Sequence, residues 1–148
     1  AFKTLGGRTV YGGGGIVPDY VVKSDTVTRL FIELASKVLR EFCDRYMNEN
    51  GDAIRKQYQS EFPRFLSGFT VGADAVVMLR SMAEKRGVKW DEVQFKADER
   101  SIKTYIKAQI ARSIWNINEK TMVDITADKQ AQKALQLFPE VQKLAKVK

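Results

Sequence analysis

The sequence of 148 residues contains no histidine and a single cysteine, Cys43. Without histidine, the chain cannot form a Ser-His or Cys-His catalytic pair, or a metal site with an imidazole ligand. One cysteine also excludes an intrachain disulfide and a cysteine cluster around a metal ion. We therefore expect this chain to bind no metal and no cofactor.

Long apolar runs are also missing, because no stretch approaches the roughly 18 residues that would predict a membrane-spanning helix. No charged segment followed by an apolar one has the pattern of a signal peptide. The 44% of hydrophobic residues is still sufficient for a chain of this length to bury a core. We expect no membrane span in this chain.

Four consecutive glycines, beginning at Gly12, precede an Ile-Val-Pro-Asp sequence that ends at Asp19. A phosphate-binding loop would need Gly-Lys-Ser or Gly-Lys-Thr after its spacer. A dinucleotide fingerprint would need a third glycine at the sixth position, where Val17 stands. Because β-prone runs lie at residues 2–4, 9–11 and 20–22, the glycines instead predict a shaped turn between strands.

A family signature overlaps these strands. Residues 2–10 read Phe-Lys-Thr-Leu-Gly-Gly-Arg-Thr-Val, and residues 15–22 read Gly-Ile-Val-Pro-Asp-Tyr-Val-Val. Together they resemble the aromatic-x-Thr-Pro-Ser-Gly-Arg-x-Ile … Gly-Ile-x-Pro-Asp-Ile-x-Val signature of carboxy-terminal processing (tail-specific) serine proteases. Leu5 and Gly6 replace the usual Pro-Ser. The structural motif comprises Gly7, Arg8, Gly12, Gly13, Gly14, Gly15, Ile16, Pro18 and Asp19.

The resemblance implies that residues 1–23 close a protease catalytic domain, whose end Arg8 and Asp19 support, and that residues 24–148 form a C-terminal helical domain. In this family the signature lies downstream of a nucleophilic serine and its lysine base, and neither motif matches any position of this chain. The resemblance therefore implies a fragment that is inactive alone, whose parent is a bacterial serine endopeptidase of the periplasm or cell envelope. The fragment's first partner would be its own catalytic domain.

From Ser24 onward, apolar residues recur at the three- and four-residue spacing of amphipathic helices. The pattern predicts a long helix capped by Ser24 or Asp25 and ended by Gly51, then a short helix over 52–60. Further helices are expected at 73–86, where Gly87 stops the pattern, at 98–118 and at 127–147. The broad apolar face of the helix over 98–118 predicts a central position for it. The predicted fold is mainly α, a bundle of four to five helices preceded by a short β-hairpin.

Cys43 lies on the apolar side of the first helix, so we interpret it as a core residue rather than a nucleophile. Four aromatic residues lie in the stretch that follows. They could stack nucleic-acid bases, but only one arginine lies among them, so packing is the better interpretation. They are Tyr58, Phe62, Phe65 and Phe69.

The net charge is +7, and basic residues share one side of the predicted helix over 98–118. Arg100, Lys103 and Lys107 are the candidate contact surface, for a protein partner or a second copy of the chain. Nucleic acid is the weaker hypothesis, because Asp98 and Glu99 interrupt the stripe and no nucleic-acid motif is present. The alternative to the protease fragment is a free-standing basic helical binding module.

Overall fold

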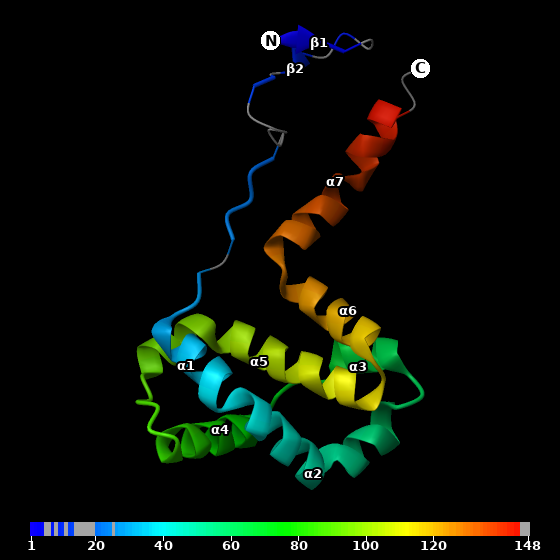
Figure 1. Ribbon diagram of the computed structural model, residues 1–148. Helices are drawn as coiled ribbons and strands as arrows, with labels where there is room; N and C mark the ends of the chain where they lie inside the picture. Colours follow the sequence, from blue (N-terminus) through cyan, green and yellow to red (C-terminus); the bar gives the residue numbers. More distant parts are fainter. Residues whose placement is uncertain (5–6, 8, 11, 14–19, 25, 146–148) are drawn as a thin grey trace. The chain divides into compact units, whose positions relative to one another are not determined.

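The computed structural model describes residues 1–4, 7, 9–10, 12–13, 20–24 and 26–145 (Figure 1). Its described elements, in chain order, are β1 (Phe2–Lys3), β2 (Thr9–Val10), α1 (Arg29–Lys37), α2 (Leu39–Tyr58), α3 (Phe62–Gly68), α4 (Ala73–Lys85), α5 (Glu92–Ile114), α6 (Ile117–Ala127) and α7 (Lys129–Ala145). The prediction of a mainly helical chain preceded by a β-hairpin is confirmed. The described part has seven helices rather than four or five.

The chain divides into two compact units. One unit is Thr26–Ala127, which contains α1 to α6, and the other combines Ala1–Asp25 with Asp128–Lys148. In the second unit, Gln130 Nε2 donates to the carbonyl of Val22 (3.0 Å) and to Ser24 Oγ (3.2 Å). The last helix therefore associates with the N-terminal segment, whereas the sequence pattern placed it with the other helices.

The hairpin is minimal. β1 and β2 pair antiparallel, with Phe2 opposite Val10 and Lys3 opposite Thr9. Gly7 has φ 77°, a conformation that glycine adopts without steric cost, and its amide donates to the carbonyl of Thr4 (2.9 Å). Because each strand has two residues, this hairpin is too small to be stable in isolation.

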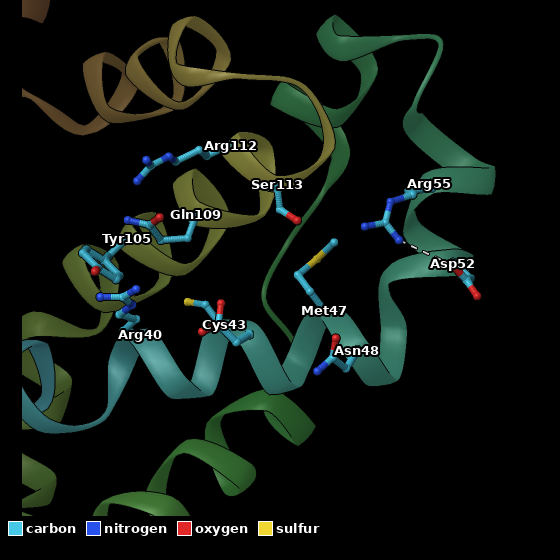
Figure 2. Close-up of a pocket in the computed structure, with 11 residues that line it drawn as sticks. Arg40, Cys43, Met47, Asn48, Asp52, Arg55, Tyr105, Gln109, Arg112 and Ser113 are labelled. Carbon is cyan, nitrogen blue, oxygen red and sulfur yellow. Dashed lines mark hydrogen bonds and ion pairs between the residues drawn. The ribbon is translucent and has the colours of Figure 1, made fainter.

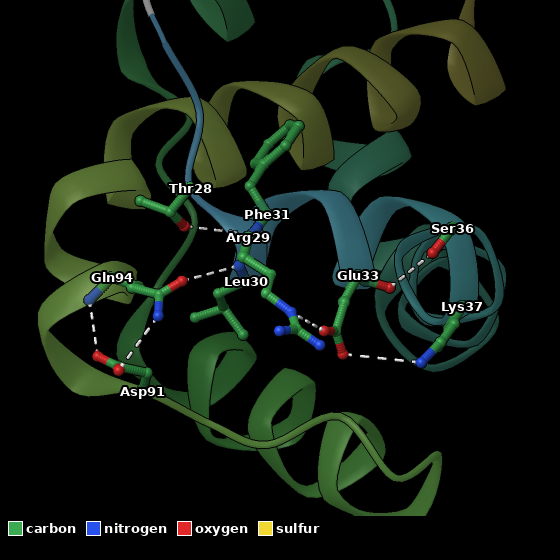
Figure 3. Close-up of polar contacts among 9 residues, drawn as sticks. All are labelled: Thr28, Arg29, Leu30, Phe31, Glu33, Ser36, Lys37, Asp91 and Gln94. Carbon is green, nitrogen blue, oxygen red and sulfur yellow. Dashed lines mark hydrogen bonds and ion pairs between the residues drawn. The ribbon is translucent and has the colours of Figure 1, made fainter.

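The first helix begins later than predicted, because its N-terminus is held by side chains of α5 and by Thr28 (Figure 3). Thr28 Oγ1 accepts from the amide of Phe31 (3.4 Å), and Gln94 Oε1 accepts from the amide of Leu30 (3.0 Å). Gln94 is fixed in turn by Asp91, which caps α5. Thr28, rather than Ser24, is therefore the N-cap; Asp25 lies outside the described residues.

The predicted long helix is interrupted once and then continues beyond its predicted end. Val38 has φ −131°, and this departure from helical geometry separates α1 from α2 while the residue stays buried. Gly51 does not end α2; it lies inside the helix, which runs on to Tyr58. The predicted short helix over 52–60 thus corresponds to the last part of α2, which ends at Tyr58. Apolar spacing is preserved across both positions, so periodicity did not reveal the break.

The central helix is α5, which packs against α1, α2 and α6. Ile102, Ile106 and Ile110 are fully buried on it, and Ala108 and Ala111 are small enough to admit a neighbouring helix closely. Its central position confirms the prediction from its broad apolar face.

Its bounds differ from those predicted. α5 starts at Glu92 rather than near 98, and it ends at Ile114 rather than near 118. Asn116 Oδ1 accepts from the amide of Asn118 (2.7 Å), which starts α6 as a separate helix. The sequence pattern missed α6 entirely.

The aromatic residues between α2 and α4 form a packed cluster. Phe65 is fully buried, and its ring centroid lies 4.8 Å from that of Phe69 and 5.1 Å from that of Trp115. Trp115 Nε1 also donates to the carbonyl of Gln59 (2.9 Å). Packing rather than base stacking is confirmed for these rings, because they are used within the unit.

Candidate functional site

The glycine motif is described only in part. Gly7 forms the hairpin turn, Gly13 has φ 121°, and Gly12 lies against the ring of Phe2. A Cβ at Gly12 would lie 2.9 Å from Cε2 of Phe2, so glycine permits this close approach. The remaining motif residues lie outside the described residues: Arg8, Gly14, Gly15, Ile16, Pro18 and Asp19. The predicted contribution of Arg8 and Asp19 to the domain end therefore stays a prediction.

The three residues of the candidate contact surface are used differently. Arg100 is exposed, with Nη2 3.5 Å from the carbonyl of Thr126. Lys103 is half-buried and pairs with Glu99 (Nζ to Oε1, 2.6 Å). Lys107 is not part of an exposed stripe, which corrects the sequence interpretation. Its half-buried side chain points to the C-terminal end of α3 rather than to solvent.

Lys107 fixes the end of α3 onto α5. Its Nζ donates to the carbonyls of Leu66 (2.7 Å) and Phe69 (2.8 Å), and it lies 5.5 Å from the ring centroid of Phe65. Burial lowers the pKa of Lys107 because desolvation penalises its charged form. Both acceptors are backbone carbonyls and no serine is among them, so we assign Lys107 a structural role rather than that of a general base.

Asp98, which the sequence placed within the basic stripe, is a charged residue buried in the core. Only 3% of it is exposed, and its Oδ2 accepts from the amide (2.8 Å) and Oγ1 (2.5 Å) of Thr28. Asp98 therefore anchors the start of α1 rather than offsetting a surface charge.

A groove of about 960 Å³ lies between α2 and α5 (Figure 2). It is lined by Arg40, Cys43, Asp44, Met47, Asn48, Asp52, Arg55, Tyr105, Gln109, Arg112 and Ser113. Sequence reasoning did not find this groove, since its residues come from two helices far apart in the chain. The sequence does contain an indication of it, because an arginine directly follows a buried apolar residue on each helix: Arg40 on α2 and Arg112 on α5.

The groove carries three guanidinium groups against two carboxylates. Arg55 lies 3.4 Å from the exposed Asp52, an arrangement that stabilises the fold little because water screens both groups. Arg40 and Arg112 make no ion pair with a carboxylate in the described part of the chain. The groove is therefore a polar site with cationic groups available to a ligand.

Cys43 lies in the floor of this groove but is only 6% exposed. Burial, with a smaller effect from Asp44, raises the pKa of the Cys43 thiol to about 12. The thiol stays protonated at neutral pH, which confirms its interpretation as a core residue and not a nucleophile.

Within the described ranges, no group of three or more acidic or cysteine side chains is placed to hold a metal ion. Among the same residues, no single helix is sufficiently long and apolar to cross a membrane. α3 and α4 together have the length and composition of a membrane span, but the two helices are bent by 78° at their junction.

Residues 30–116, more than half of the chain, match a family of unknown function (DUF8443). The chain belongs to this family. The match spans α1 to α5 and the start of the turn into α6, all within the unit Thr26–Ala127. No curated protein and no solved structure matches the chain.

Proposed function

We propose that this chain is the C-terminal, non-catalytic portion of a bacterial carboxy-terminal processing serine endopeptidase of the periplasm or cell envelope. Its helical unit docks on the catalytic domain or on a partner and supports assembly or regulation. The parent hydrolyses peptide bonds near the C-termini of its substrates. Its nucleophile is a serine activated by a neutral lysine, and both residues precede this chain in the parent sequence. The chain alone is inactive.

The observation that carries this proposal is the signature at residues 2–22, supported by the hairpin that its first part forms. Two two-residue strands are too short to be stable alone, as expected for a hairpin that adds to a larger sheet. The DUF8443 match covers residues 30–116 and so lies outside the signature. The family match and the protease resemblance are therefore independent of each other.

A docking role is supported by the way the helical unit is built. Thr26–Ala127 has its own core, including fully buried Leu34, Phe42, Leu79 and Ile106, so its fold does not depend on a neighbouring domain. Its outer faces are then available for contact. Of the predicted basic surface, Arg100 and Lys103 remain candidates, because Lys107 is used internally.

Peptidase assays test the proposal. The purified chain should not cleave an unstructured peptide. The native protein, captured with an antibody against the helical unit, should cleave the same peptide near the peptide's C-terminus. Reproducible cleavage by the chain alone, abolished by replacing one of its own serines, would falsify the assignment.

The second candidate is a free-standing basic helical binding module, favoured by the net charge of +7 and by the arginines of the groove. This candidate predicts that the native protein, isolated in the same way, has no peptidase activity.

A further inference from the structure

The groove between α2 and α5 has a polar lining with three arginines, and neither Arg40 nor Arg112 forms an ion pair among the described residues. Figure 2 shows Arg40 and Tyr105 toward one end of the groove and the guanidinium of Arg55 directed toward Met47. We infer that this groove binds an acidic peptide segment in extended conformation. The inference is independent of the protease assignment.

Charge complementarity identifies the ligand class. Arg40 and Arg112 have planar guanidinium groups that can hold a carboxylate by two parallel hydrogen bonds. Neither group is paired with a carboxylate elsewhere in the described residues. A ligand with spaced carboxylates would supply these missing partners.

The remaining lining favours a peptide over a nucleic acid. Asn48, Gln109 and Ser113 offer both donors and acceptors, which suits the amide groups of a peptide backbone. Asp44 and Asp52 can accept hydrogen bonds from the amides of a peptide, whereas a DNA backbone has no N–H group to donate to them.

The groove has the length of a short peptide. Arg40 and Arg55 lie fifteen positions apart on α2, which corresponds to at most about 22 Å along the helix axis. An extended peptide covers this distance with roughly seven residues. The ligand therefore needs carboxylates near both of its ends to meet both arginines.

Gly51 provides a second, independent indication. It is a buried glycine inside α2, where glycine costs about 1 kcal/mol relative to alanine. A Cβ there would lie 3.0 Å from Nη1 of Arg55 and 3.2 Å from Cε of Met47. The missing side chain lets Arg55 fold over the helix toward the groove instead of extending into solvent.

Fluorescence anisotropy with the full chain tests the inference at low ionic strength. The probe is a fluorescein-labelled peptide of about seven residues, with glutamates at its ends and centre and serines elsewhere; a second probe has glutamine in place of glutamate. The glutamate probe should bind saturably and at least about tenfold more tightly than the glutamine probe. Arg40→Gln and Arg112→Gln should each weaken binding by about tenfold.

Arg45→Gln is the matched control. Arg45 lies on the same helix, is exposed, and pairs with Glu49 (2.8 Å) outside the groove. This variant makes the same change in net charge and should alter affinity less than about twofold. An equal loss in Arg45→Gln and Arg40→Gln would show attraction by net charge only and would overturn the site.

Two further outcomes would also overturn the inference. One is the absence of saturable binding of the glutamate probe up to about 1 mM. The other is tighter, arginine-dependent binding of single-stranded DNA, which would make the groove a nucleic-acid site. Amide chemical-shift changes confined to α2 and α5 on adding the glutamate probe would support it.

Discussion

Replacing Asp98 tests the physical account of how the helical unit is held together. Asp98 is 3% exposed and joins α5 to the start of α1 through two hydrogen bonds to Thr28. Asp98→Ala removes both bonds and leaves the amide of Thr28 without its acceptor. Hydrogen bonds to charged groups contribute about 1.5 to 3 kcal/mol, so we expect a loss of about 3 kcal/mol in the free energy of unfolding.

For a unit of about 100 residues, this loss lowers the midpoint of thermal unfolding by roughly 10 to 15 °C. Circular dichroism with urea and thermal melts measures both quantities. Asp52→Ala is the control, because the Asp52 side chain is fully exposed and its replacement should change stability by less than about 0.5 kcal/mol.

A double-mutant cycle separates this contact from other effects of the change. Thr28→Val removes the hydroxyl from the same pair, and its effect should be smaller after Asp98 has been replaced, with a coupling energy of about 1 kcal/mol or more. Thr28→Ser keeps the hydroxyl and should be close to wild type. If Asp98→Ala lies within about 0.5 kcal/mol of wild type, the proposed anchoring of α1 by α5 is wrong.

Three further predictions concern single residues. Burial raises the pKa of the Cys43 thiol from 9.0 to about 12, so above pH 9 the thiol loses its proton in the unfolded chain before it does so in the folded chain. The free energy of unfolding should therefore fall between pH 9 and 12, by about 1.4 kcal/mol at pH 10. A titration of stability against pH should show no such loss in Cys43→Ala. Gly51→Ala should raise the free energy of unfolding by up to about 1 kcal/mol, because alanine is the better helix former. It should also weaken binding of the glutamate peptide, because the new Cβ displaces Arg55. A decrease in the free energy of unfolding would contradict this prediction. Lys107→Met should cost about 1 to 3 kcal/mol by leaving two carbonyls without their donor, whereas Lys103→Met should change urea-unfolding stability by less than about 0.5 kcal/mol; equal effects would refute the distinction.

Periodicity predicted the fold class, the central position of α5 and the extent of α4, because these depend on one broad apolar face and one clear stop. Gly87, with φ 72°, ends α4 as the sequence pattern indicates. Periodicity failed at Val38 and at Gly51, because a local change of backbone angle, or a glycine inside a helix, leaves apolar spacing unchanged.

The candidate site was less predictable for a related reason. Lys107 has the spacing of an exposed basic residue, and only the position of the C-terminal end of α3 explains why it is directed inward. The groove depends on how α2 and α5 pack, and no local pattern within either helix encodes that arrangement.

The central claim is that the chain is the non-catalytic end of a serine endopeptidase, and a peptide map of the native protein tests it most directly. The native protein is isolated with an antibody against residues 26–127, digested, and sequenced by mass spectrometry. The account predicts peptides that continue upstream of Ala1 into a segment with the serine and lysine of a catalytic dyad. A native protein whose sequence begins at or near Ala1 would contradict it.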